Sequence, residues 1–401
     1  MKALKKYFFI ALLFWVTIAT YGLILRWHLV KPLPINYFNW LNAHSHAAFL
    51  GWLHAALAVL LAYVFFPAFA EGKTFRRLYW FSQLTVAGLL ISFPVQGYKT
   101  FSIIFLSLFL LGTYVFAWIY LKKSENAERF PGAYRLGKNA VFFLVLSSVS
   151  PWMLGPTMVM LGKQSIWYNL DIYFYLHFQY NGWFFLALLA LLVYLFEWKG
   201  FVFPVRKIKL ISNLLFWGIL FGYITNTLWT QPPLVFNIVA MISVFAEGAG
   251  LWLLYRELNP EASRIFDRPF DKTLWKLVWL AIGVKIILQF MASCPYFARV
   301  TYHTRDLIIG YLHWVMLGLF STGILFVARR VKMMYLDKKS FILFYAGMLL
   351  MEFFIFLRGT AIWRKWNLDW PFPLLIFLAT FVMFIGIVFI VVLWKKEPTD
   401  T

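Results

Sequence analysis

Residues 42–66 read NAHSHAAFLGWLHAALAVLLAYVFF, a stretch of 25 residues whose only ionisable side chains are three histidines and one tyrosine. An α-helix rises about 1.5 Å per residue, so about 20 mostly apolar residues cross the roughly 30 Å hydrocarbon core of a bilayer. The stretch therefore predicts a membrane-spanning helix. Its alanines and its glycine would let a neighbouring helix or a flat ring approach the backbone closely.

Eleven other stretches of similar length and hydropathy follow the same pattern. We predict an all-α protein, a polytopic membrane bundle of about twelve transmembrane helices that forms one membrane domain over residues 1–401. The first stretch begins like a signal peptide, but no small-x-small cleavage site follows it before Arg26, so we expect it to remain as a span. The predicted spans are 7–26, 42–66, 79–96, 101–121, 139–160, 170–194, 208–228, 233–255, 274–293, 306–327, 340–357 and 372–394.

The composition supports a lipid environment. Hydrophobic residues make up 62% of the chain and charged residues 13%, whereas soluble domains are about 45–50% apolar and about 25% charged. We therefore expect the lipid bilayer as the main partner of this surface. The single cysteine, Cys294, excludes an intrachain disulfide and a cluster of thiolate metal ligands.

The net charge of +21 is explained by membrane topology, so it does not indicate a nucleic-acid partner. Basic residues mark the cytoplasmic loops of membrane proteins. With the N-terminus inside, the inner segments hold 27 Lys and Arg and the outer loops hold 9. We predict that both termini are cytoplasmic.

Histidines occur at one predicted depth on three spans that run from outside to inside. His44 and His46 lie about one turn into the second span, and His177 and His313 lie about two turns into the sixth and tenth spans. This places them roughly 5–11 Å below the outer surface. Ligands from separate helices at one level are what a haem or metal site in a bundle requires, and imidazole is a usual ligand of haem iron and copper. The alternative is a set of interfacial histidines hydrated by lipid headgroups.

The two histidines of the second span cannot both bind one iron. His44 and His46 are two residues apart, which is about 200° around a helix. The sequence leaves open which of them is the ligand.

Four further polar residues lie inside predicted spans: Asn226, Glu247, Lys285 and Glu352. An ionisable group within a membrane span is a functional candidate by default. We expect these residues to lie in a proton or water path, or to form structural pairs.

The pattern as a whole resembles subunit I of the haem-copper oxidases, a superfamily that includes the nitric oxide reductases. Twelve spans, an internal N-terminus, and histidines on the second, sixth and tenth spans carry the resemblance. The segments AHSHAAFLGW, residues 43–52, and LHFQYNGWF, residues 176–184, are similar to those of divergent oxidase-like bacterial membrane proteins. The early H-x-H is also similar to that of NnrS-type membrane proteins, which bind haem and copper.

The resemblance implies a cofactor and its ligands. His46 (or His44) and His313 would be the axial ligands of a low-spin, bis-histidine haem. His177 would match the copper-binding histidine of the sixth span, and would hold copper or a second haem.

Basic residues between the last two predicted spans add an anion site. Arg358, Arg364 and Lys365 make this the most basic outer loop, against the topological bias. The loop therefore predicts a local anion, either haem propionates or a lipid phosphate. The resemblance implies that Arg358 and Arg364 are propionate anchors, on loop position alone.

The departures from the family pattern limit the expected chemistry. The seventh span lacks the paired histidines of the copper site, Tyr311 stands where oxidases carry a second histidine on the tenth span, and Asn181, next to Tyr180, stands at the position of the family's cross-linked tyrosine. We therefore expect no complete haem-copper binuclear centre. The expected role is respiratory electron transfer or the handling of nitric oxide or another small gas, in a bacterial cytoplasmic (inner) membrane, with a redox partner protein or a quinone. If the protein is an enzyme, it would be a haem-dependent oxidoreductase.

The alternative is a twelve-span secondary transporter whose histidines line a proton-coupled path. Transporter sites lie near the bilayer midplane on interrupted helices. The histidines here are predicted in the outer third of the membrane, which favours the haem interpretation.

Overall fold

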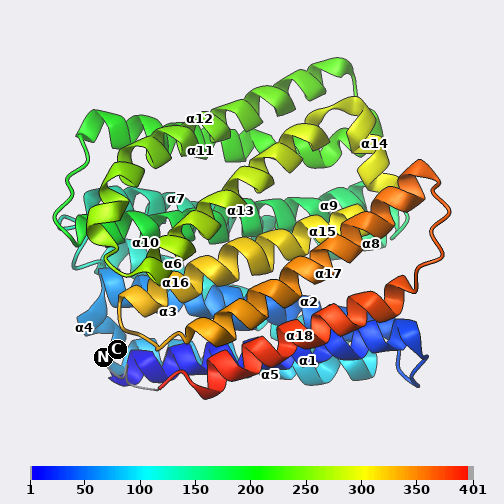
Figure 1. Ribbon diagram of the computed structural model, residues 1–401, viewed down its shortest axis with the longest axis horizontal. Helices are drawn as coiled ribbons and strands as arrows, with labels where there is room; N and C mark the ends of the chain where they lie inside the picture. The colour runs from blue at the N-terminus through cyan, green and yellow to red at the C-terminus, as the bar shows by residue number, and fades with distance from the viewer. Residues whose placement is uncertain (1, 396–401) are drawn as a thin grey trace. The chain divides into compact units, whose positions relative to one another are not determined.

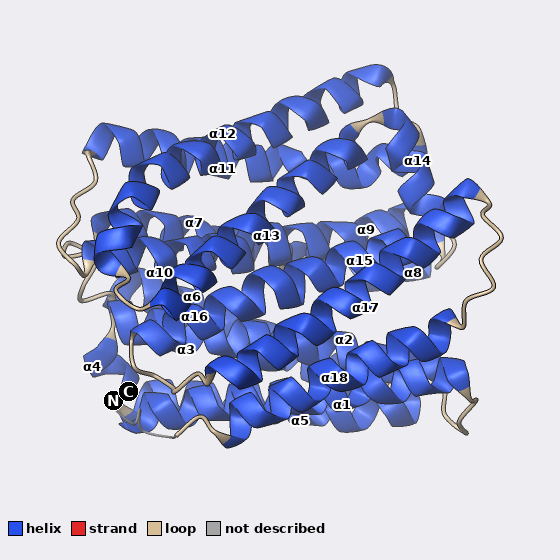
Figure 2. Ribbon diagram, viewed as in Figure 1, coloured by secondary structure: helices blue, strands red, loops and turns tan. Residues whose placement is uncertain are grey.

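The computed structural model describes residues 2–395, and within them every regular element is a helix (Figure 2). Twelve helices in this part of the chain are long and apolar enough to cross a membrane. The all-α prediction is confirmed, and the chain is a multi-pass membrane protein. The orientation of its termini stays a prediction.

Each predicted span corresponds to one observed span, and five spans are composed of consecutive helical segments. The first part of the chain forms α1 (Lys2–Val30), α2 (Tyr37–Ala47), η1 (Ala48–His54), α3 (Ala55–Phe65), α4 (Pro67–Ala70), α5 (Lys73–Gln96) and α6 (Thr100–Lys123). The middle part forms α7 (Pro131–Ser147), α8 (Val149–Leu161), α9 (Ile166–His177), η2 (Phe178–Phe184), α10 (Phe185–Glu197), α11 (Val205–Gly222), η3 (Tyr223–Thr230), α12 (Leu234–Ile265), α13 (Pro269–Ser293) and α14 (Pro295–His303). The last part forms α15 (Arg305–His313), η4 (Trp314–Ser321), α16 (Thr322–Arg330), α17 (Lys338–Arg364) and α18 (Phe372–Val392).

The chain packs as two compact units. Unit 1 combines the chain up to Phe116 with the chain from Leu312 onward, and unit 2 runs from Ala117 to Tyr311. The prediction of a single domain stays a prediction, and each unit is described by itself below.

Unit 1 is organised around helices from both ends of the chain. α1 and α18 are antiparallel neighbours, because Phe9 stacks on Trp394 at 4.5 Å between ring centroids and Trp27 contacts Phe377 at 5.0 Å. α17 and α18 form a hairpin, and α1, α17 and α18 can be followed side by side in Figure 1. Asp337 begins α17 by accepting a hydrogen bond from the backbone N–H of Ser340 at 2.8 Å, as an N-cap does.

Unit 2 is organised around the sixth span, which is the most enclosed of the twelve. α7 packs against η2 and α10, and α11 forms a hairpin with α12. Gly218 permits the close approach of α11 and α12, because a methyl group there would lie within 3.0 Å of the backbone of Ser243 and Glu247.

Three spans contain a π-helical segment: η1, η2 and η4. These are the second, sixth and tenth spans, which are also the three most buried. His177 and His313 are the residues directly before η2 and η4, and His46 stands two residues before η1. Since π-helical turns are rare and frequently mark functional sites, their position supports a functional role for the histidines.

Candidate functional site

Four spans of unit 1 meet at one point, which we call the aromatic junction: Trp15, Trp52, Ser321 and Phe344. The indole N–H of Trp52 donates a hydrogen bond to the Ser321 hydroxyl at 2.9 Å, which connects η1 to η4. Trp15 stacks on Trp52 with 4.9 Å between ring centroids and meets Phe344 edge to face at 5.1 Å. The junction fixes the relative heights of α1, the second span, the tenth span and α17.

A layer of polar residues lies at a constant distance from this junction. His44 is eight residues before Trp52, His313 is eight residues before Ser321, and Glu352 is eight residues after Phe344. Eight residues correspond to about 12 Å along an α-helix, and somewhat less where a turn is π-helical.

The helix directions place these three residues on the same side of the aromatic junction. α1 is antiparallel to the second span. Trp52 contacts Trp15, whereas His44, earlier in its span, contacts Ile18, which comes after Trp15 in α1. α1 and α17 run in the same direction, because each of them is antiparallel to α18. α16 and α17 are joined by a short turn that reverses the chain. Counting residues along these directions therefore assigns His44, His313 and Glu352 to one level of unit 1.

The ring of His44 is held so that one nitrogen remains for a ligand. Its Nδ1 lies 3.0 Å from the carbonyl oxygen of Ile18, so Nδ1 carries the proton and donates it. Its Nε2 then presents a lone pair. Gly22 leaves room for the ring, because a methyl group there would lie 3.2 Å from the His44 Cε1. A histidine that donates its second N–H to a backbone carbonyl is the usual form of a metal-ligating imidazole.

The ring of His46 faces a different neighbour, as the 200° separation predicts. Its Nδ1 donates to the carbonyl of Asn42 at 2.8 Å, and its Nε2 accepts from the Tyr98 hydroxyl at 3.1 Å. The ring packs against Phe93 of α5 at 4.7 Å. Both nitrogens of His46 are thus hydrogen-bonded, whereas His44 keeps one lone pair without a hydrogen bond among the described residues.

The third predicted ligand, His177, lies in unit 2 in a complete set of hydrogen bonds. Its Nε2 donates to the carbonyl of Ile219 at 2.8 Å, and its Nδ1 accepts from the side-chain amides of Asn226 at 2.8 Å and Asn181 at 3.2 Å. A metal on either nitrogen would have to displace one of these bonds. Both ring nitrogens of His177 therefore have partners in the protein.

A second buried polar group in unit 2 is an ion pair between α12 and α13. Lys285 donates to the Glu247 carboxylate at 2.7 Å and to Gln289 at 2.8 Å, and its ammonium group lies 4.4 Å from the ring centre of Phe185. The Lys285 and Glu247 side chains are 0% and 2% exposed. These two charges were expected to lie in a proton or water path or to form a pair, and the structure shows them paired.

Tyr180 and Tyr311 approach one another in unit 2. In the comparison with the oxidase pattern, Tyr180 lies next to the position of the cross-linked tyrosine, and Tyr311 lies at the position of the second histidine of the tenth span. Their ring centroids are 6.2 Å apart.

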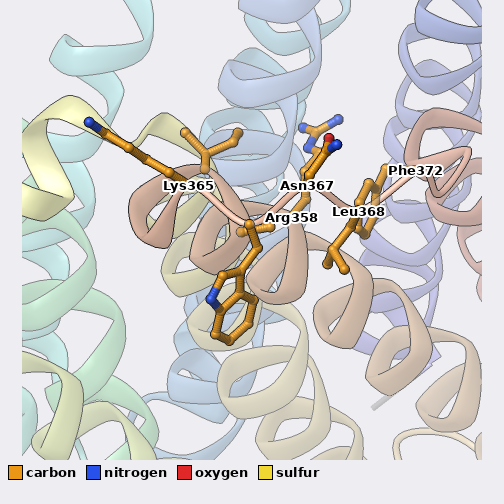
Figure 3. Close-up of a pocket in the computed structure, with 8 residues that line it drawn as sticks. Arg358, Lys365, Asn367, Leu368 and Phe372 are labelled. Carbon is orange, nitrogen blue, oxygen red and sulfur yellow. The ribbon is translucent and has the colours of Figure 1, made fainter.

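The basic loop after α17 borders a pocket of about 610 Å³ (Figure 3). Arg358 and Lys365 line it together with Asn367, Leu368 and Phe372, and no acidic residue is among its lining residues. Lys365 extends to the side opposite Asn367, Leu368 and Phe372 (Figure 3).

Arg364 does not line this pocket. Its guanidinium lies 5.6 Å from the ring centre of the adjacent Trp363. Of the two predicted anion anchors, Arg358 is therefore the one that the structure places at a pocket.

Within residues 2–395, no three His, Cys, Asp or Glu side chains are arranged to hold a metal ion. A haem with two axial histidines does not require such a group. No family model matches the chain, and no curated protein matches it significantly. The resemblance to oxidase subunit I consequently rests on the residues quoted above.

Two features of the site could not be predicted from the sequence. Arg26 appeared only as a charge near the end of the first span, and its action on His44 and Glu352 depends on the packing of α1. The hydrogen bond between Trp52 and Ser321 joins residues 269 positions apart. No local pattern signals either contact.

Proposed function

We propose that this chain is a haem-binding integral membrane protein of the oxidase subunit I type that transfers electrons. The proposal rests on the equal residue spacing of His44 and His313 from the aromatic junction. Each lies eight residues from the hydrogen bond that joins Trp52 to Ser321, on the same side of the aromatic junction.

The residues present fit a bis-histidine haem in unit 1. His44 would supply one axial Nε2, since its Nδ1 is already anchored on a backbone carbonyl. His313 would supply the other. Arg358, which lines the pocket after α17, would bind propionates, and Arg364 is assigned to the same role by loop position alone. Held by two histidines, a haem would supply one-electron redox chemistry.

The hydrogen bonding of His177 favours electron transfer over catalysis. Copper or a second haem at His177 would create a reactive centre, but both ring nitrogens already have partners in the protein. We therefore favour a carrier or a redox sensor over a haem-dependent oxidoreductase. A bacterial cytoplasmic membrane and a quinone or protein redox partner belong to the same proposal.

The test is an absorption spectrum of the purified, detergent-solubilised protein, first oxidised and then reduced with dithionite. We expect a sharp Soret band, with resolved α and β bands after reduction. His44→Ala and His313→Ala should each abolish the low-spin spectrum, whereas His177→Ala should leave it intact. His46→Ala separates the two histidines of the second span, and it should retain the spectrum if His44 is the ligand.

A featureless spectrum from protein made in haem-replete cells would refute the proposal. Loss of the low-spin bands in His46→Ala with retention in His44→Ala would keep the haem but reverse the ligand assignment. If no haem were found, the transporter hypothesis would be tested next, and His177 would be the first residue to mutate.

A further inference from the structure

Two glutamates are buried in the spans, and their surroundings differ. Glu247 in unit 2 has a cationic partner, the Lys285 ammonium group at 2.7 Å. Glu352 in unit 1 is 3% exposed, and neither of its carboxyl oxygens has a hydrogen-bond partner among the described residues. A buried carboxylate without a hydrogen bond or a contacting cation is among the most costly groups that a protein can hold.

The elements around Glu352 offer little to stabilise a negative charge. α18, which packs along α17, has no ionisable residue between Phe372 and Val392. The Thr380 hydroxyl of α18 already donates to the carbonyl of Ile376. η4 has no ionisable residue, and His313 stands at its N-terminal boundary.

The charged residue whose field reaches Glu352 is Arg26 of α1, which also acts on His44. On α17 itself, the nearest charged residue toward the C-terminus is Arg358, six positions away.

We propose that Glu352 is a proton-binding site within the spans of unit 1, where its carboxyl group holds an exchangeable proton at neutral pH. A proton neutralises the carboxylate without any further ligand. A metal cation would need several oxygen ligands, and the neighbouring Arg26 charge opposes a second cation. The same Arg26 charge stabilises the carboxylate that remains when the proton leaves, so the site is able to release its proton as well as bind it.

The site shares a charged neighbour with the histidine layer, because Arg26 acts electrostatically on both Glu352 and His44. This inference does not depend on haem binding, since it concerns the proton on a side chain of the protein itself.

Infrared spectroscopy of the purified protein tests the site directly. We expect a carbonyl stretching band of a protonated carboxylic acid, which shifts in D₂O and decreases as the pH is raised. Glu352→Gln should remove the band. Glu257→Gln is the control, because Glu257 forms an ion pair with Lys207 at 2.8 Å near the end of α12 and should contribute no such band.

Arg26→Gln provides a second, independent readout. Without the neighbouring positive charge, the proton should be held more tightly, and the band should persist to higher pH than in the parent protein. The proposal is overturned if no Glu352-dependent band exists at any pH, or if the band does not exchange in D₂O. Exchange of the band in D₂O is measured on the parent protein, so this outcome can be decided even if a variant fails to fold.

Discussion

Breaking the ion pair of unit 2 should destabilise the protein strongly, and removing both charges should restore most of the loss. Lys285→Met leaves the Glu247 carboxylate 2% exposed and without the ammonium group that contacts it at 2.7 Å. Removal of one partner of a buried pair costs about 3–5 kcal/mol. The contact with Phe185 adds up to about 2 kcal/mol, because the ammonium lies 4.4 Å from the ring centre in a desolvated site.

The double variant Lys285→Met with Glu247→Met removes both charges and keeps side chains of similar length. Replacing a whole buried pair with apolar residues is often neutral or stabilising. Because each single variant should lose about 3–5 kcal/mol and the double variant should lie near the parent protein, we expect a coupling energy of at least about 3 kcal/mol in the double-mutant cycle.

The assay is reversible unfolding of the purified protein by SDS in mixed micelles, followed by tryptophan fluorescence. Additive losses, with the double variant as unstable as the sum of the two single variants, would refute the reasoning. That result would mean that the two charges do not stabilise one another across α12 and α13.

Two further predictions concern packing in unit 1 and use the same unfolding assay. Gly347→Ala would place a methyl group against the backbone of Met383 and should cost about 1–3 kcal/mol of stability. The control is Gly283→Ala, whose methyl group would meet nothing within 4 Å and should gain up to about 1 kcal/mol through helix propensity. Equal effects of the two variants would contradict the close contact of α17 and α18. Ser321→Ala leaves the buried indole N–H of Trp52 without its acceptor and should cost about 1–3 kcal/mol. A neutral Ser321→Ala variant would show that the aromatic junction does not hold the second and tenth spans at a fixed height.

The number and order of the spans could be predicted from the sequence because each span satisfies a local condition. The bilayer requires about 20 consecutive apolar residues, and this condition applies to residues 42–66 independently of all other spans. The boundaries were less accurate. α12 extends to Ile265, beyond the predicted end at 255, because a helix continues into the interface where apolar residues are no longer required.

The candidate site was predicted in part. The sequence predicts a common depth for His44, His177 and His313 from counting residues along spans of predicted direction, and in unit 1 His44 and His313 lie at equal residue spacing from the aromatic junction. The partners of these histidines could not be predicted, since they depend on which spans are neighbours. The carbonyls of Ile18 and Ile219 that anchor two of the rings have no side-chain signature at all.

The π-helical segments change how the histidines are oriented relative to the junction residues of the same span. A π-helical turn accommodates one additional residue, so the side chains after it are rotated relative to those before it. In the second span, His44 donates to Ile18 of α1 before η1, and Trp52 within η1 stacks on Trp15 of α1 and reaches Ser321. The tenth span has the same order, with His313 before η4 and Ser321 at its end. An uninterrupted α-helix would relate both pairs of residues by a fixed rotation, whereas the π-helical turns allow the histidine level and the junction to be oriented independently. The extra residue in each of these spans therefore sets the orientation of the histidines relative to the junction.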